Sequence, residues 1–316
     1  MDTILVTGGY GFIGSNFIRM ISESDALANK YRVINVDKIT YAANKSSIAN
    51  CKNIESYCVD IADNQSIGSI FSEHKIDYVI NFAAETHVDN SIKSPSEFVK
   101  TNVLGTGVLL DYAKAFGVKK FLQISTDEVY GSIEEGLFTE TSPLDPSSPY
   151  SASKVSADHL VLAYHKTFKL PVNITRCSNN YGIWQHSEKL IPTIINKIAN
   201  NKKIPIYGTG KNIRDWIHVS DHCAAILTVL ENGVNGEIYN VGSSNEIRNI
   251  DIAKKILNIL NESESMIEYV EDRKGHDFRY AIDSSKIQNT LGWKPTVDFY
   301  TGLENVVNWY YMNLSV

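Results

Sequence analysis

The amino-acid sequence predicts an α/β protein, in which a Rossmann-type, doubly wound parallel sheet is followed by a smaller C-terminal α/β lobe. Short apolar runs alternate with amphipathic helical patterns through the first half, which is typical of a parallel sheet covered by helices on both faces. A glycine-rich turn at residues 8–14 follows the first apolar run directly. Beyond residue 180 the segments shorten and glycine turns interrupt them, which indicates a second architecture.

The expected elements follow this alternation in order. Strands are predicted at residues 3–7, 32–37, 56–60, 78–82, 120–125 and 172–176. Helices are predicted at residues 12–22, 65–73, 97–116 and 150–168. Pro149 stands at the entry of the last helix, where its fixed φ suits the first turn. Residues 237–241 have the pattern of a further strand of the same sheet.

Composition restricts the class of protein. The chain has 316 residues, of which 43% are hydrophobic and 21% charged, and its net charge is −6. These values are typical of a soluble globular protein with an ample core, and they give no indication of a nucleic-acid surface. The first residues lack the pattern of a secretory signal, and no run approaches the ~18 apolar residues of a membrane span. We therefore expect a cytoplasmic protein with no nucleic-acid or membrane partner.

The cysteines do not indicate a metal site. Cys51, Cys58, Cys177 and Cys223 contain no C-x-x-C pair, so zinc and redox motifs are unsupported and no metal is expected. Cys177 lies in a strand pattern and Cys223 in a helical one, so both are predicted to be buried free thiols. Free thiols fit a reducing cytoplasm.

The glycine turn predicts a dinucleotide site. Gly8, Gly11 and Gly14 are spaced G-x-x-G-x-x-G, and Phe12 and Ile13 open the expected helix. Glycines in such a strand–turn–helix allow a tight turn and let backbone N–H groups approach a pyrophosphate at the helix N-terminus. The N-terminal residues 1–180 are therefore predicted to be the dinucleotide-binding domain, which also receives later segments, and residues 181–316 mainly a substrate-binding lobe.

The ends of the later strands supply further cofactor candidates. Asp37 closes the second expected strand, where a carboxylate accepts hydrogen bonds from the adenosine ribose and repels a 2′-phosphate, which favours NAD over NADP. The alternative is that Asp37 is only a turn residue, and Lys38 beside it could tolerate a phosphate. The remaining candidates are Thr40 near this strand end, Asp60 and Ile61 at the third strand, and Ala83 and Ala84 at the fourth.

Two polar runs predict the chemistry. Tyr150 and Lys154 lie four residues apart and share one face of a helix, where an ammonium can stabilise a phenolate and lower the phenol pKa from about 10 toward neutrality. Such a phenolate can take a proton from a sugar hydroxyl as hydride leaves the same carbon. Asp127 and Glu128 follow Thr126, and adjacent carboxyls in a closed site tend to have split pKa values, which provides one acid and one base. In isolation such a pair is more often a helix cap or a salt-bridge site.

The glycine turn together with Tyr150 and Lys154 resembles the extended short-chain dehydrogenase/reductase group. The run from Ser125 to Gly131 narrows the resemblance to nucleotide-sugar 4,6-dehydratases, above all the dTDP-glucose 4,6-dehydratases. Matching segments extend almost end to end, at residues 37–42, 83–89, 177–182, 188–192, 214–216 and 275–283. Dimerisation is implied by the family, and the helices at 97–116 and 150–168 could form the interface of a homodimer.

The resemblance implies a redox-neutral cycle on NAD. Tyr150, assisted by Lys154 and Thr126, takes the proton of the glucose 4-hydroxyl while hydride passes from C4 to NAD. Glu128 then removes the C5 proton and Asp127 protonates the departing 6-hydroxyl. Hydride return to C6 gives a 4-keto-6-deoxy sugar. Which carboxyl is the acid comes from the family and not from the spacing.

The resemblance also assigns binding residues. For NAD it adds Thr101 and Asn180, besides Tyr150 and Lys154. For the nucleotide diphosphate sugar it implies contacts from His87, Thr126, Asn179, Lys189, Leu190, Pro205, Ile206, Tyr207, Arg214, Asn249, Arg273, His276 and Tyr280. A guanidinium suits bidentate binding of a diphosphate better than an ammonium does.

Departures from the family pattern leave the substrate more open than the reaction. Residues 183–187 replace a Pro-aromatic run, and Lys274 replaces a proline. Neither change touches the catalytic candidates. The alternatives are a UDP-sugar 4,6-dehydratase, a UDP-sugar 4-epimerase or decarboxylase of the same fold, or a non-catalytic NAD-sensing protein. The carboxyl pair after Thr126 favours dehydration, because epimerases and decarboxylases do not need it.

Overall fold

The computed structural model describes residues 1–272 and 275–314. Within them, seven parallel strands form one sheet in the order β10-β6-β5-β4-β1-β2-β3. Its strands are β1 (Asp2–Thr7), β2 (Tyr31–Asp37), β3 (Ile54–Cys58), β4 (Tyr78–Asn81), β5 (Lys120–Thr126), β6 (Val172–Cys177) and β10 (Ile238–Val241). The predicted doubly wound sheet is confirmed, including the late strand, which pairs in parallel with β6.

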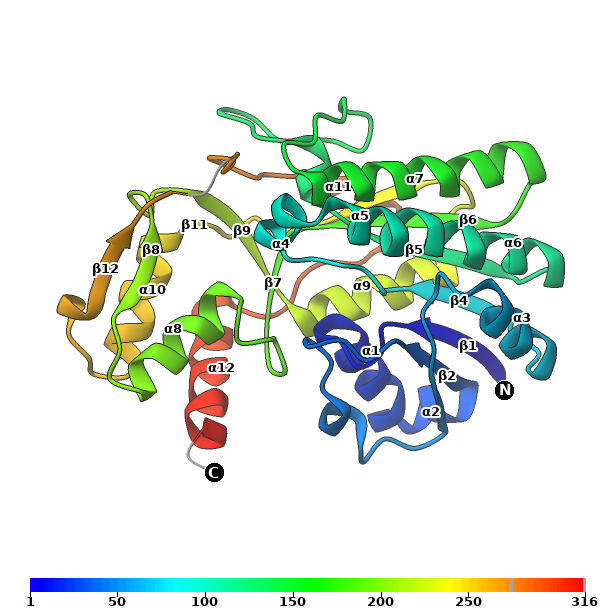
Figure 1. Ribbon diagram of the computed structural model, residues 1–316, viewed down its shortest axis with the longest axis horizontal. Helices are drawn as coiled ribbons and strands as arrows, with labels where there is room; N and C mark the ends of the chain where they lie inside the picture. Colours follow the sequence, from blue (N-terminus) through cyan, green and yellow to red (C-terminus); the bar gives the residue numbers. More distant parts are fainter. Residues whose placement is uncertain (273–274, 315–316) are drawn as a thin grey trace.

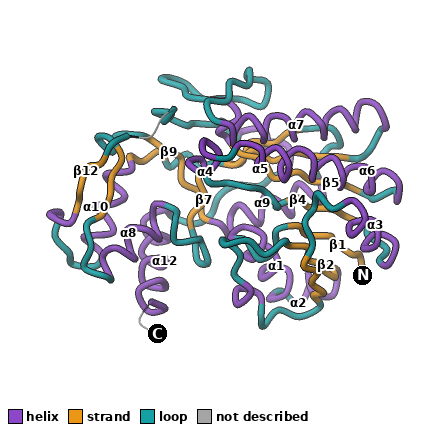
Figure 2. Tube along the Cα trace, in the orientation of Figure 1, coloured by secondary structure: helices purple, strands orange, loops and turns teal. Residues whose placement is uncertain are grey.

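Helices cover both faces of this sheet (Figures 1 and 2). Side chains alternate along β1, so that Ile4 and Val6 pack on one face and Leu5 on the other. The first face is covered by α1 (Phe12–Glu23), α9 (Val219–Asn232) and α11 (Ser285–Leu291). The second face is covered by α3 (Asn64–Glu73), α6 (Thr106–Phe116) and α7 (Pro149–Phe168). Short segments on this part of the chain are α2 (Asp25–Lys30), η1 (Lys45–Ile48), α4 (Val88–Lys93) and η3 (Asp127–Tyr130).

The helix predicted at 97–116 is not continuous. It is built from α5 (Pro95–Phe98), a π-helical stretch η2 (Val99–Gly105) and then α6. The wider turn holds Thr101 and Asn102 in buried positions. Asn102 uses both ends of its amide there, because its Oδ1 accepts from the Glu85 N–H and its Nδ2 donates to Ser153 Oγ on α7. A π-helical turn inside an α-helix is frequent at functional sites.

The C-terminal lobe has its own core and its own small sheets. A three-stranded sheet has the order β11-β9-β7, and β8 pairs in parallel with β12. Ile195, Trp216, Ile256 and Leu303 are among the buried side chains that hold it together. Its elements are β7 (Asn179–Tyr181), α8 (Leu190–Ala199), β8 (Ile204–Tyr207), β9 (Ile213–His218), β11 (Glu246–Arg248), α10 (Asn249–Ile259), η4 (Glu264–Met266), β12 (Ile267–Val270) and α12 (Phe299–Leu314).

The cysteines and the end of β3 were also predicted from the sequence. Cys177 and Cys223 are buried free thiols, as predicted. The third strand ends at Cys58, so the prediction of a strand at 56–60 was displaced by two residues. Within residues 1–272 and 275–314, no helix is long and apolar enough to cross a membrane.

Candidate active site

The glycine turn joins β1 to α1 in a conformation that needs glycine. Gly8 has φ +71°, and a Cβ there would lie 2.9 Å from the backbone of Ala83. A Cβ on Gly14 would lie 2.4 Å from the Gly8 carbonyl oxygen. Among the described residues, no side chain caps α1 at Gly11. The helix N-terminus is therefore available to an anionic group such as a pyrophosphate.

Asp37 closes β2 beside this turn. Its carboxylate accepts hydrogen bonds from the backbone N–H groups of Tyr10 (3.0 Å) and Ile39 (2.8 Å), so it also acts as a turn residue. Burial raises its pKa, although the two backbone hydrogen bonds and Lys38 act in the opposite direction. Lys38 is directed elsewhere, because its ammonium pairs with Glu85 (2.7 Å) and donates to a hydroxyl on η2.

A cavity of about 290 Å³ lies at the carboxyl ends of the central strands. Ligands of open α/β sheets bind at this edge. Fifteen of the sixteen predicted cofactor residues line it, namely Gly8, Gly11, Phe12, Ile13, Gly14, Asp37, Lys38, Thr40, Ile61, Ala83, Ala84, Thr101, Tyr150, Lys154 and Asn180. Asp60 does not line it: β3 ends two residues earlier, and its carboxylate accepts from the Ala62 N–H and pairs with Lys100.

The run that follows β5 places two carboxyls at the floor of this cavity. Thr126 Oγ1 lies 3.2 Å from Asp127 Oδ1 and accepts a hydrogen bond from the Glu128 N–H at 3.3 Å. Asp127 is only 3% exposed, and its Oδ2 has no hydrogen-bond partner among the described residues. Burial, together with the charges of Glu128 and Asp215, raises its pKa well above the ordinary value. These surroundings favour the protonated form of Asp127, which is the form that a general acid needs.

Tyr150 and Lys154 come from the first turns of α7. Ser148 caps this helix in a capping box with Ser151, and Pro149 occupies the first turn, as expected from its fixed φ. Both functional side chains are buried and line the same cavity as Asp127. The Lys154 ammonium donates to the Ile124 carbonyl oxygen at 2.6 Å.

The predicted low pKa of Tyr150 was wrong. Burial and the neighbouring charge of Glu128 raise the pKa of Tyr150 well above 10.0. Burial also lowers the pKa of Lys154, although Asp158 acts in the opposite direction. Helical spacing shows that the two groups share a face, but it does not show that both are buried or that the charge of Glu128 lies beside the tyrosine.

A second cavity, of about 260 Å³, lies between the catalytic run and the C-terminal lobe. It adjoins the first, because Thr86, Glu128, Asn179, Glu188 and Lys189 line both. The predicted substrate residues that line it are His87, Asn179, Lys189, Leu190, Pro205, Ile206, Tyr207, Arg214, Asn249, His276 and Tyr280. Thr126 lines the first cavity only. Arg273 lies outside the described residues.

Arg214 is held by the backbone around it. Its guanidinium donates to the carbonyl oxygens of Ile213, Asp277 and Phe278, and it stacks on the Tyr280 ring at 4.1 Å. The Tyr280 hydroxyl in turn donates to the Asp277 carboxylate at 2.7 Å. The cavity thus holds a fixed cation, which is suited to an anionic ligand.

Sequence reasoning missed several lining residues. Ser125 and Cys177, at the ends of β5 and β6, line the first cavity and could have been found from the rule that ligands bind at carboxyl strand ends. Glu188 lies 3.7 Å from both His87 Nε2 and His186 Nδ1, and no sequence pattern indicates the contact with His87, which comes from a distant segment. His186, in the segment that departs from the family, lines the first cavity.

Comparisons with known proteins agree with this arrangement. A family model described as GDP-mannose 4,6 dehydratase matches residues 5–306. A dTDP-glucose 4,6-dehydratase from Xanthomonas campestris pv. campestris (strain B100) is 48% identical over 99% of this chain and 94% of that protein. The crystal structure of a dTDP-glucose 4,6-dehydratase from Streptomyces venezuelae, with NAD and TYD bound, is 43% identical, covers 99% of this chain and 98% of the other, and superposes with a TM-score of 0.94.

A related activity shares the fold. The structure of a UDP-glucose 4-epimerase from Thermotoga maritima, with UDP-glucose, is 29% identical, covers 99% of each chain and gives a TM-score of 0.92. The sheet alone therefore does not separate dehydration from epimerisation. Identity across the whole chain is much higher to the dehydratases. The chain belongs to the nucleotide-sugar 4,6-dehydratase family, within the extended short-chain dehydrogenase/reductase group.

Proposed function

We propose that this chain catalyses the NAD-dependent dehydration of a nucleotide diphosphate glucose, dTDP-glucose first of all, to the 4-keto-6-deoxy sugar. The observation that carries the proposal is the carboxyl pair Asp127 and Glu128, placed beside Tyr150 in one cavity. Glu128 also lines the adjoining cavity, so that a ligand spanning both meets the whole catalytic set. Similarity to dTDP-glucose 4,6-dehydratases supports the choice of substrate.

The first cavity fits a dinucleotide by its shape and donors. The glycines leave room against the Gly8 and Ala83 backbone, and Asp37 lies where a ribose would be held. When bound, NAD supplies the hydride acceptor and donor, and a ring charge that favours a phenolate nearby. Residues 1–180 are proposed to bind this cofactor and residues 181–316 mainly the nucleotide sugar.

Tyr150 takes the proton of the sugar 4-hydroxyl. Lys154 lies one turn further along α7, where its positive charge favours the phenolate form of the tyrosine. The Thr126 hydroxyl lies beside the Tyr150 hydroxyl and orients the tyrosine against the sugar. Because burial opposes the charged phenolate, this step depends on positive charge added beside Tyr150, which the ring of bound NAD would supply.

The two carboxyls divide the elimination of water. Oxidation at C4 makes the C5 proton more acidic, and Glu128 removes this proton. The electron pair of the broken C5–H bond then forms the C5–C6 double bond. The C6–O bond breaks, and the hydroxyl leaves as water with the proton that Asp127 holds. A raised pKa suits Asp127 to this role, because the carboxyl must be protonated before the hydroxyl can leave.

The adjoining cavity would bind the nucleotide diphosphate. Arg214 and His276 are proposed to contact the diphosphate, and Tyr207 is available to stack on the base. The reaction class is that of a hydro-lyase. We further propose that the protein is a cytoplasmic homodimer, as the family implies.

One experiment separates the proposal from its alternatives. Purified protein is offered dTDP-glucose, UDP-glucose, UDP-N-acetylglucosamine and UDP-glucuronic acid side by side, and the products are separated by chromatography and identified by mass spectrometry. Loss of one water from dTDP-glucose is the expected result, and loss from a UDP-sugar instead would move the assignment to that base. A product of unchanged mass would indicate an epimerase, loss of carbon dioxide from a uronic acid substrate a decarboxylase, and binding of NAD without turnover a sensor.

A further inference from the structure

Residues 275–283, called the strap below, connect the two parts of the molecule. On one side the Ile213 N–H at the start of β9 donates to the Phe278 carbonyl oxygen at 2.8 Å. On the other side the N–H groups of Ile133 and Phe138 donate to the carbonyl oxygens of Arg279 (3.2 Å) and Ala281 (3.0 Å). The strap is therefore held between β9 and the loop at residues 131–147.

That loop connects the two catalytic runs. It begins directly after η3, which contains Asp127 and Glu128, and it ends at the cap of α7, one turn from Tyr150. In Figure 1 the loop and the strap lie next to each other at one edge of the molecule. A displacement of the loop would therefore be transmitted to both ends of the catalytic set.

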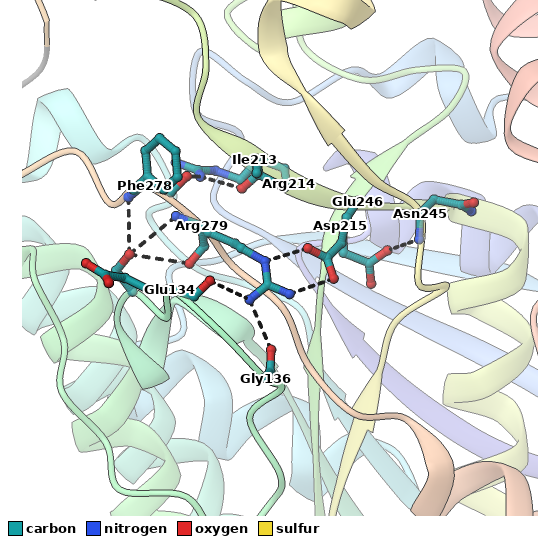
Figure 3. Close-up of polar contacts among 10 residues, drawn as sticks. Glu134, Gly136, Ile213, Arg214, Asp215, Asn245, Glu246, Phe278 and Arg279 are labelled. Carbon is teal, nitrogen blue, oxygen red and sulfur yellow. Dashed lines mark hydrogen bonds and ion pairs between the residues drawn. The ribbon is translucent and has the colours of Figure 1, made fainter.

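Arg279 links the loop, the strap and β11 through one guanidinium (Figure 3). Its Nε and Nη2 donate to the two carboxylate oxygens of Glu246, at 2.6 and 2.8 Å. Its Nη1 donates to the carbonyl oxygens of Gly136 (3.0 Å) and Glu134 (3.4 Å) in the loop. Only 14% of the side chain is exposed. An isolated surface ion pair contributes little, but this one is bidentate, half-buried and extended by two backbone acceptors.

Two strap residues near Arg279, namely Asp277 and Tyr280, line the second cavity, which is called the nucleotide-sugar cavity below. Tyr280 stacks on Arg214 there and donates to Asp277, whose carboxylate also accepts from Ser147 at the end of the loop. Side chains alternate along an extended segment, so Arg279 and Tyr280 point to opposite sides. The outward residue can thus fix the inward one without touching a ligand.

We propose that Arg279 is a positioning residue for the reaction: through Glu246 and the loop carbonyls it holds the nucleotide-sugar cavity in register with the catalytic runs. This inference rests on the proposed function. It assigns to Arg279 no contact with the substrate, the cofactor or the reacting atoms. It does require that loss of the pair alter substrate binding more than it alters the chemical step.

The test is a kinetic comparison of Arg279→Gln, Arg279→Lys and Glu246→Gln with the unmodified protein. Arg279→Gln should raise KM for dTDP-glucose roughly tenfold while kcat stays within about threefold, because a charge-assisted bidentate pair is lost away from the reacting atoms. Arg279→Lys should have a KM between that of Arg279→Gln and that of the unmodified protein, since an ammonium keeps the charge but not the planar fork of the guanidinium. Arg32→Gln breaks a remote pair with Glu55 and serves as the control with unchanged KM.

A second measurement does not need the substrate. Hydrogen exchange of the free proteins should be faster in Arg279→Gln at the amides of Ile133, Phe138 and Tyr280, and unchanged there in Arg32→Gln. If the unmodified protein dehydrates none of the nucleotide sugars offered, the proposed function fails and hydrogen exchange alone decides the role of Arg279. If it dehydrates one of them, an unchanged KM in Arg279→Gln overturns the positioning role and leaves the function standing, even when the melting temperature falls. If hydrogen exchange in Arg279→Gln is unchanged at these amides, the positioning role is overturned whether or not the protein dehydrates the sugar.

Discussion

The two adjoining cavities are built in different ways. The functional groups of the first follow the ends of neighbouring parallel strands or the first turns of α7, and Asp127, Tyr150 and Lys154 are all less than a tenth exposed. Those of the second come mostly from separate segments of the C-terminal lobe, with His87 and Glu128 added from the sheet domain, and cross-links such as Arg214 on Tyr280 hold them. The first cavity is thus a product of sheet topology, and the second is assembled by long-range contacts.

This difference predicts a division of labour. Groups fixed by the sheet edge can be placed accurately enough for proton transfer. Groups carried by loops and braces can change from one relative to another without disturbing the sheet, which suits the selection of a base and sugar. Substitutions in the first cavity should therefore lower kcat, and substitutions in the second should raise KM.

The largest effect is expected for Tyr150→Phe. Removal of the hydroxyl leaves no group to take the proton of the 4-hydroxyl, so kcat should fall roughly 10³-fold, within the usual range for a general base. Turnover is followed by product mass, and NAD content is measured on the same sample. Bound NAD should be unchanged, because Phe keeps the ring that packs against Phe98. Near-normal turnover would remove the tyrosine from the mechanism.

The next effect is the loss of elimination in the double variant Asp127→Asn, Glu128→Gln. Oxidation at C4 should persist and appear as absorbance of the reduced cofactor, while product should fall by roughly 10²-fold or more. Glu55→Gln is the control, since the Glu55 carboxylate pairs with Arg32 on the other side of the sheet domain's binding edge and lines neither cavity. It should retain most of the dehydration. Full dehydration by the double variant would refute the carboxyl assignment.

Arg214→Lys tests the second cavity. Lysine loses the planar fork that donates to three carbonyl oxygens and stacks on Tyr280, so KM for the nucleotide sugar should rise roughly tenfold with kcat within about threefold. Steady-state kinetics measure both values. Arg248→Lys, on an exposed pair with Asp251, is the control. An equal fall in kcat would contradict the division between the cavities.

The sheet and the first cavity could be predicted from the sequence because the patterns that indicate them span only a few neighbouring residues. The glycine turn, the apolar runs and the capped start of α7 each depend on residues close in sequence, and carboxyl strand ends then meet by topology. The break in the helix at 99–105 was not predicted, since Asn102 is satisfied by partners on other elements. The predicted end of the third strand lay two residues too late, since element boundaries are the least reliable part of such a prediction, and the cofactor contact of Asp60 stays a prediction.

The second cavity was predicted through family resemblance, and its braces were not predicted at all. Glu246 and Arg279 are far apart in sequence, and neither lies in a pattern that signals the pair. The direction of the Tyr150 pKa failed for a similar reason, because burial is a property of the assembled site. Residue type and spacing therefore identify chemistry better than they identify environment.

The smallest effect is on stability and concerns Asp127 again. The pKa of Asp127 is raised in the folded protein. The stabilisation that its protonated form provides is therefore complete below the ordinary pKa near 4 and declines as the pH rises through the folded pKa. Wild-type stability therefore carries a cost at alkaline pH that Asp127→Asn removes. Asp127→Asn should melt about 2–4 °C higher than the unmodified protein at about pH 9, and the gain should grow as the pH rises.

Asp77 provides the opposite sign in the same sheet. Burial acts to raise its pKa, but the Thr3 N–H and Lys119 outweigh burial and leave the pKa lowered, so its contribution is present above the ordinary pKa. Asp77→Asn should therefore melt lower than wild type at neutral pH. Thermal melts of both variants between about pH 5 and 9 give the comparison. If Asp127→Asn instead melts lower by an amount that stays constant across this pH range, Asp127 is ionised in the folded protein and cannot be the acid that releases water.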